Sequence, residues 1–169
     1  MVAWQSPMCS SESFRPTVDE LNRAARHMKE NGFGFSYHHH HFEMFRHGER
    51  TALDYLIENA PDVHITLDTY WLQYGGADML RTIDRLAGRV RCLHLKDYRI
   101  KAEKKETGKI TFTPQFAPVG EGVLDFKEIV KHAKAAGTVH FLVEQDDAGT
   151  YPDPLAQVRS SIDYIKEYL

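Results

Sequence analysis

Short runs rich in apolar residues alternate along the chain with longer segments of helical periodicity. Four of these runs, each six or seven residues long, are typical of strands that are buried on both faces. Strands separated by helices predict a parallel sheet built from βα units. The predicted strands cover residues 33–38, 63–68, 90–96 and 139–144, and the predicted helices cover about 15–31, 51–59, 79–88 and 125–137, with a last one from about 154.

Two of the predicted helices begin with the spacing of an N-terminal cap. Thr17 precedes Glu20 by three residues, and Asp125 precedes Glu128 by the same distance. Side chains at this spacing satisfy the free backbone N–H groups of a first helical turn. We therefore expect helices to open at about residues 15–20 and at 125.

The stretch 97–122 shows neither pattern. It is polar and includes the charged segment 101–106. We expect it to form a long, solvated and mobile loop. No inter-domain linker is visible elsewhere, so residues 1–169 are expected to form a single domain.

Net charge, apolar run length and cysteine count indicate which kinds of partner and compartment to expect. The formal net charge is -3, so there is no basic excess to suggest a nucleic-acid partner. The apolar runs are far shorter than the roughly 20 residues that cross a bilayer, and the first residues lack the pattern of a signal peptide. Two cysteines do not suggest a disulfide framework, so we expect a cytoplasmic protein without a membrane partner.

Every predicted strand ends in residues that bind metals or move protons. In parallel βα architectures the carboxyl ends of the strands meet on one face, where sites are built. Histidine and carboxylate ligands suit Mn, Co, Zn, Fe or Mg. A lone histidine at a strand end is more often structural, but recurrence at four ends favours a site. The residues are His38 and His40, then Asp68, then His94 and Lys96, and finally Glu144.

Alternation along a strand places His38 and His40 on one face, and likewise His94 and Lys96. Either pair could set one ligand beside one substrate-contacting group. In the alternative reading, Lys96 is simply solvated and Asp97 caps a loop.

Five segments, in order, resemble motifs of the sugar phosphate isomerase/epimerase family, the xylose isomerase-like barrels. The similarity extends from Trp4 to the last helix. The segments are Tyr37–Glu43 ("YHNHxFE"), Leu67–Trp71 ("LDTYW"), His94–Asp97 ("HxKD"), Gly120–Asp125 ("GEGxxD") and Val143–Asp146 ("VEQD").

The resemblance implies an α/β fold, an incomplete (β/α)8 TIM barrel. Family barrels have about 250 residues, so this chain is expected to hold about the fourth to eighth βα units. Residues 1–4 would then be the end of the fourth strand. An open barrel exposes strand edges, so we expect either a homo-oligomer that covers the open barrel edge or a truncated chain.

The resemblance also implies a divalent metal site and roles for its neighbours. His38 stands where epimerases of the family usually carry a glutamate. No role is implied for His39 or His41. The implied metal ligands are His38, Asp68, His94 and Glu144; the implied catalytic residues are Glu144, His40 and Lys96; and the implied substrate-binding residues are Glu43, Trp71 and Asp97.

The function implied by the resemblance is a metal-dependent isomerase or epimerase of a sugar or sugar phosphate. It would remove a proton next to a carbonyl and stabilise the enediolate with the metal. The alternatives are a keto-polyol dehydratase of the same superfamily and a catalytically inactive truncated barrel. The endonuclease branch is not expected, because ligands for a three-metal cluster are not apparent.

Overall fold

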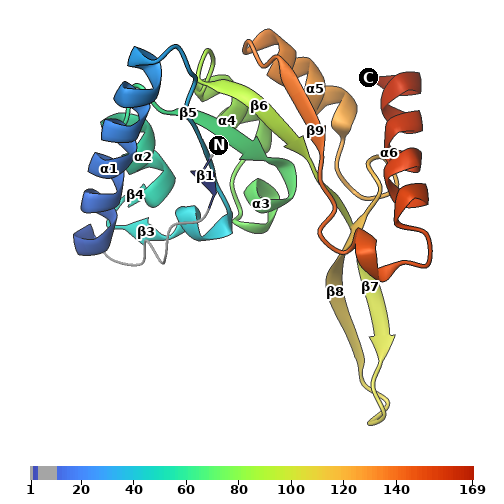
Figure 1. The fold of residues 1–169 in the computed structure, drawn as a ribbon. Helices are drawn as coiled ribbons and strands as arrows, with labels where there is room; N and C mark the ends of the chain where they lie inside the picture. Colours follow the sequence, from blue (N-terminus) through green and yellow to red (C-terminus); the bar gives the residue numbers. More distant parts are fainter. Residues whose placement is uncertain (1, 4–10) are drawn as a thin grey trace.

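The centre of the computed structural model, which describes residues 2–3 and 11–169, is a parallel five-stranded sheet (Figure 1). β1 and β9 are the edges of this sheet in the described part of the chain. The α/β architecture of a partial barrel is therefore confirmed. The strands lie in the order β1 (Val2–Ala3), β2 (Ser36–His38), β5 (His64–Asp68), β6 (Val90–Leu95) and β9 (His140–Val143).

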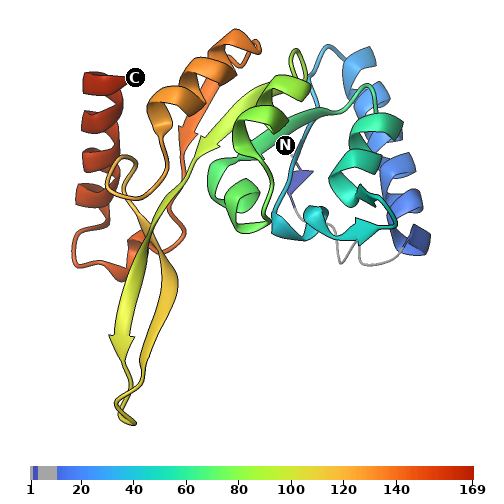
Figure 2. The same cartoon turned by 180° about the vertical axis from the view of Figure 1, so that it is seen from behind.

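The helices lie beside the sheet in chain order, from α1 at one end to α6 at the other (Figures 1 and 2). Asp125 caps α5 as predicted, because its side chain accepts a hydrogen bond from the Glu128 backbone N–H. Within the described residues, no helix is long and apolar enough to span a membrane. The helices are α1 (Ser11–Glu30), α2 (Ala52–Asn59), α3 (Thr69–Tyr74), α4 (Met79–Arg85), α5 (Phe126–Ala135) and α6 (Pro154–Tyr168).

The start of α1 was predicted wrongly. The helix begins at Ser11 rather than at about residue 15, and Pro16 lies inside it. Thr17 and Glu20 are therefore interior residues, and their capping spacing carries no structural signal here. The expected strand end near the N-terminus is confirmed for Val2–Ala3, which pairs in parallel with Tyr37 and His38. Met1 and Trp4 lie outside the described residues.

The expected loop at 97–122 is also wrong for most of its length. Residues 97–117 form a long antiparallel hairpin of β7 (Asp97–Lys104) and β8 (Ile110–Ala117), paired from Asp97 with Ala117 to Lys104 with Ile110. The hairpin projects well beyond the rest of the protein in both views (Figures 1 and 2). A smaller hairpin joins β3 (Arg46–His47) to β4 (Arg50–Thr51).

The hydrophobic core lies between the sheet and the row of helices. Strand residues at alternate positions and the apolar stripes of the helices meet there, which is the usual way in which βα units bury their surface. The most deeply buried members, each at 0% or 1% exposure, include Leu53, Leu56, Ile65, Leu67, Ile83, Leu93 and Phe126.

Asp97 fixes the base of the long hairpin. It is fully buried, and its carboxylate accepts hydrogen bonds from the backbone N–H groups of Tyr98, Gly120, Gly122 and Leu124 at 2.8, 3.0, 2.9 and 3.3 Å. A Cβ atom at Gly122 would lie 2.1 Å from Asp97 Oδ1, so only glycine allows this approach. The carboxylate therefore ties the segment after the hairpin to the hairpin's first residue.

We expect Asp97→Ala to lower the free energy of unfolding by about 2–4 kcal/mol, because it leaves four backbone N–H groups without their acceptor. Urea denaturation measures this change. Asp125→Ala is the control, since loss of an exposed helix cap costs only about 1 kcal/mol. A loss for Asp97→Ala no larger than that of the control would contradict the proposed clamp.

Candidate metal centre

The carboxyl ends of four strands bring two histidines and two carboxylates together. His38 ends β2, Asp68 ends β5, His94 lies near the end of β6, and Glu144 directly follows β9. One candidate ligand atom from each residue lies within 4.8 Å of the corresponding atoms of the other three. The parallel register explains this arrangement, because it pairs Asp68 with His94 on neighbouring strands.

Asp68 lies at the centre of the cluster. Its Oδ2 atom is 3.6 Å from His38 Nε2 and 4.0 Å from His94 Nδ1. His94 Nδ1 also contacts Glu144 Oε2. Asp68 is 0% exposed and the two histidines are 4% and 5% exposed, so three of the four residues are shielded from water.

Several buried atoms of this cluster have no hydrogen-bond partner among the described residues. Asp68 Oδ2 and His38 Nε2, which face each other, are two of them. Buried polar atoms are nearly always satisfied, and a bound ion is one accepted explanation when they are not. A divalent cation between these atoms would satisfy both, and the mixture of imidazole and carboxylate suits Mn, Zn, Co, Fe or Mg. The residues therefore fit a metal site.

The other oxygen of Asp68 has a structural partner. Oδ1 accepts a hydrogen bond from the Trp71 backbone N–H at 2.9 Å and caps α3. Asp68 Oδ2 is thereby turned toward the histidines. Sequence analysis did not predict α3, so it did not predict this second role of Asp68.

Electrostatics within the cluster favour an ionised carboxylate beside a basic imidazole. Burial lowers the pKa of His94, but contacts with Cys92 and Glu144 outweigh this effect and raise the pKa to about 9. Burial acts to raise the pKa of Glu144, yet hydrogen bonding to His94 and the charge of Lys96 bring it below its ordinary value.

Lys96 is a buried cation next to the cluster. It is 1% exposed, and its Nζ lies 3.1 Å from Glu144 Oε1 and 2.8 Å from Asp146 Oδ2. The same atom lies 4.8 Å from the centre of the Trp71 ring and 4.9 Å from that of Phe116. Sequence analysis did not single out Asp146 for a role, although its position two residues after Glu144 is the spacing of one strand face.

His40 and Trp71 line the cluster on one side. The His40 ring lies 4.8 Å from that of His38 and 5.2 Å from that of Trp71. Burial, followed by the nearby His38, lowers the pKa of His40 to about 4, so its ring is neutral near pH 7. His41 stacks on the outer side of Trp71 at 5.0 Å. Together these rings form an aromatic wall beside the candidate ligands.

His39, to which no role was assigned, joins two of the strand ends. It is fully buried; its Nδ1 lies 3.0 Å from the His40 carbonyl oxygen, and its Nε2 accepts the Asp68 backbone N–H at 3.1 Å. Because a carbonyl oxygen only accepts, the ring proton must sit on Nδ1. Burial lowers the pKa of His39 to about 4, which keeps the ring neutral. His39 therefore holds the backbone of one candidate ligand against the segment that carries another.

The structure does not bring Glu43 and Asp97 to the open part of the site. Glu43 is 0% exposed, and its carboxylate accepts hydrogen bonds from Tyr37 Oη at 2.5 Å and from the His40 backbone N–H at 2.7 Å. These contacts hold η1 (His41–Met44) and the histidine run in place. Asp97 is fully engaged at the base of the hairpin.

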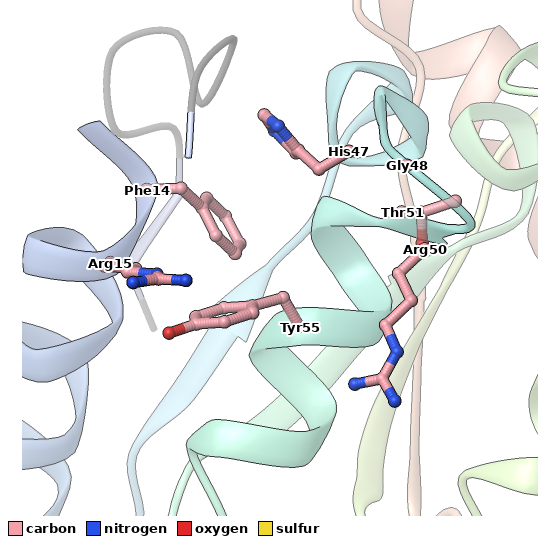
Figure 3. Close-up of a pocket in the computed structure, with 7 residues that line it drawn as sticks. All are labelled: Phe14, Arg15, His47, Gly48, Arg50, Thr51 and Tyr55. Carbon is pink, nitrogen blue, oxygen red and sulfur yellow. The ribbon is translucent and has the colours of Figure 1, made fainter. Parts of the chain in front are cut away.

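A separate cavity of about 420 Å3 lies between α1, α2 and the turn from β3 to β4 (Figure 3). Phe14 and Tyr55 meet edge to face across it at 5.3 Å. It contains none of the four candidate ligands, and Arg50 at its rim is paired with Glu58. This cavity is not part of the candidate metal centre.

Comparison with known proteins gives consistent matches. The family model described as xylose isomerase-like TIM barrel matches residues 3–168. An inosose dehydratase of Geobacillus thermodenitrificans is 30% identical over an alignment of 172 positions, which covers 96% of this chain and 57% of the relative. The chain thus spans little more than half the length of the curated relatives it matches.

Solved structures are similar in fold. A sugar phosphate isomerase/epimerase from Parabacteroides distasonis superposes with a TM-score of 0.77 at 21% identity, over 98% of this chain and 57% of that one. A xylose isomerase-like TIM barrel protein from Mycobacterium smegmatis in complex with magnesium has a TM-score of 0.68 at 16% identity, over 98% of this chain and 53% of that one.

We expect the purified protein to bind about one equivalent of Mn2+ or Co2+, because the cluster offers four ligand atoms around one point. His94→Ala should weaken metal binding by about tenfold to a hundredfold, as measured by isothermal titration calorimetry. His132→Ala is the matched control, since that histidine is paired with Asp84 outside the site. Equal affinities in the two variants would show that the cluster does not hold the metal.

The buried Glu43 predicts a pH-dependent stability. Burial raises its pKa from 4.5 to about 7, so the folded protein holds a proton that the unfolded chain releases above about pH 4.5. The stability of the wild type relative to Glu43→Gln should therefore be greatest below pH 4.5, fall as the pH rises to about 7, and then stay constant. Thermal unfolding of both proteins between pH 4 and pH 8 measures this. A difference in stability independent of pH would contradict it.

Proposed function

The chain belongs to the xylose isomerase-like TIM barrel family, and on this premise we propose that it carries the metal centre of a dehydratase acting on a polyhydroxylated ketone. The convergence of His38, Asp68, His94 and Glu144 supports this proposal most directly. The relative at 30% identity is named for the removal of water from inosose, and inosose belongs to this class of ketones.

We favour dehydration over the isomerase or epimerase activity predicted first, and His38 is the reason. Epimerisation needs two groups that exchange protons with opposite sides of one carbon. Where the related epimerases place a glutamate, this chain places His38, whose Nε2 faces Asp68 Oδ2. A single carboxylate with an exposed part remains in the cluster, Glu144 at 28% side-chain exposure. Elimination of water needs only one such group.

Loss of water removes a proton from the carbon beside a carbonyl and a hydroxide from the next carbon, and it leaves a carbon–carbon double bond. We assign removal of this proton to Glu144, whose Oε1 faces Lys96 and whose Oε2 faces His94. The same carboxyl returns the proton to the departing hydroxyl when both groups lie on one side of the substrate, so water leaves and Glu144 is again ionised.

Lys96 positions Glu144 rather than contacting substrate. Its side chain is 1% exposed, and its hydrogen bond keeps the carboxylate oriented and ionised between turnovers. His40 is half-buried and neutral, and its ring lies beside those of His38 and Trp71, so we assign it to a substrate hydroxyl or carbonyl. A bound divalent cation would supply Lewis acid chemistry, the stabilisation of negative charge on the carbonyl oxygen.

Trp71 is the residue that we assign to the apolar face of the substrate carbon skeleton. Its ring stands beside His40 and Lys96 at the edge of the cluster. Glu43 and Asp97, for which substrate contact was predicted, are enclosed on all sides. We assign them positioning roles, Glu43 for the histidine run and Asp97 for the hairpin. The substrate partner remains a small sugar or sugar-like molecule.

The test is an assay with inosose and Mn2+, Co2+ or Mg2+ in turn. We expect a product one water lighter by mass spectrometry, and Glu144→Gln should reduce the rate by at least a hundredfold, because it removes the group that takes the proton.

His132→Ala serves as the control and should retain the wild-type rate. Stereochemical inversion of a sugar without loss of water would instead establish the epimerase. Metal binding without turnover of either substrate class would support the inactive barrel.

A further inference from the structure

The long hairpin has one apolar face that nothing in the described part of the chain covers. Antiparallel register puts directly paired residues on the same face, so the even-numbered residues of β7 and β8 share one side. Three large apolar side chains on this side are more than half exposed to solvent: Phe112 is 69% exposed, Ile110 55% and Ile100 54%. We name the apolar part of this side the ribbon face, formed by Ile100, Ala102, Ile110, Phe112 and Pro114, and Lys104 lies at its outer end opposite Ile110.

The opposite side of the hairpin is polar. It consists of Arg99, Lys101, Glu103, Thr111, Thr113 and Gln115. A two-stranded hairpin is marginal in water unless a hydrophobic face packs against something. The hairpin nevertheless extends away from the protein as a regular ribbon over eight pairs. Its amphipathic pattern therefore indicates a face made to be covered.

The ribbon face leads to the candidate metal centre. At its base Phe116 lies 4.8 Å from Tyr70, and Tyr70 lies 5.4 Å from Tyr74, which is 54% exposed. Phe116 also lies beside Lys96. A continuous series of rings thus joins the ribbon face to the aromatic wall. Whatever covers the ribbon face also borders the opening of the site.

Charge distribution along the hairpin is self-complementary. Its tip carries Lys104 and Lys109, both exposed, and neither makes an ion pair within the described residues. Its base lies beside Asp146, which is 47% exposed and contacts Lys96 next to Phe116. Two hairpins stacked face to face and antiparallel would place each basic tip over the other's Asp146, whose carboxylate pairs with the buried Lys96 and is still 47% exposed. This is the geometry of a two-fold symmetric contact.

The surface area that two ribbon faces can bury supports a contact that also includes the exposed Tyr74 ring. Strands of eight residues at roughly 3.4 Å per residue give a face about 27 Å long and about 10 Å wide. The flat area of this face is about 270 Å2. The protruding side chains of Phe112, Ile110 and Ile100, each more than half exposed, bring its accessible area to the order of 500 Å2, so two ribbons alone bury about 1,000 Å2, at the lower limit for a specific interface. A stable dimer requires the adjoining exposed ring of Tyr74 as well.

From these observations we propose that a second copy of this chain packs against the ribbon face, and that the hairpin tip of each copy lies over the other's Asp146 at the opening of the metal centre. This contact is separate from the sheet edges β1 and β9, at which self-association was predicted from sequence. It does not depend on the reaction that the centre catalyses.

Sedimentation velocity on the full 169-residue chain tests the proposal. The wild type is expected to be a dimer at about 10–100 µM, in the range of a micromolar dissociation constant. Phe112→Asp and Ile110→Asp should each convert it to a monomer with unchanged circular dichroism. Thr113→Asp is the matched control, because Thr113 is exposed on the polar side of the same hairpin, and it should remain a dimer.

A second measurement addresses the charges. Lys104→Glu combined with Lys109→Glu should weaken the dimer about tenfold, with a larger effect at low salt. A monomeric wild type would overturn the proposal. A dimer that survives Phe112→Asp and Ile110→Asp would overturn it as well, and would place the contact elsewhere, for example at a sheet edge. Equal loss of the dimer in Thr113→Asp would also overturn it.

Discussion

The carboxylate of Asp68 is the point on which the site depends, because its two oxygens have different tasks. Oδ1 caps α3, and Oδ2 faces His38 and His94 with no hydrogen-bond donor among the residues that the structure describes. The cap fixes the rotation of the side chain, so Oδ2 points toward the histidines. It also sets where α3 begins and thereby where the Trp71 ring stands. One side chain thus positions both a ligand atom and the aromatic wall.

Much of the fold could be predicted because βα units repeat one physical pattern. The four predicted strands all occur, and their ends deliver the predicted residues to one place, because a period of two fixes which side chains share a face. What sequence could not supply were contacts between distant segments. His39 acts on Asp68, 29 residues away. No local pattern in the histidine run indicates that contact.

The errors in prediction have physical causes of a different kind. The hairpin was missed although Tyr98, Ile100 and Ala102 alternate with polar residues, because the density of charge in 101–106 was taken as the dominant signal. Charge is compatible with a strand when one side of that strand faces water. The start of α1 was misplaced because the capping spacing of Thr17 and Glu20 was taken to mark it, whereas the helix begins at Ser11 and contains both residues.

His39 has a consequence for how this site can change over time. Both ring nitrogens are committed, one to the chain that carries His38 and His40 and the other to the backbone of Asp68. The ring of His39 therefore links the two strand ends. A substitution at one strand end changes the effect that a substitution at the other has on the site. Residues linked in this way show non-additive effects. Variation at positions 38 and 68 is thus expected to be epistatic, with few single-step routes from this ligand set to another.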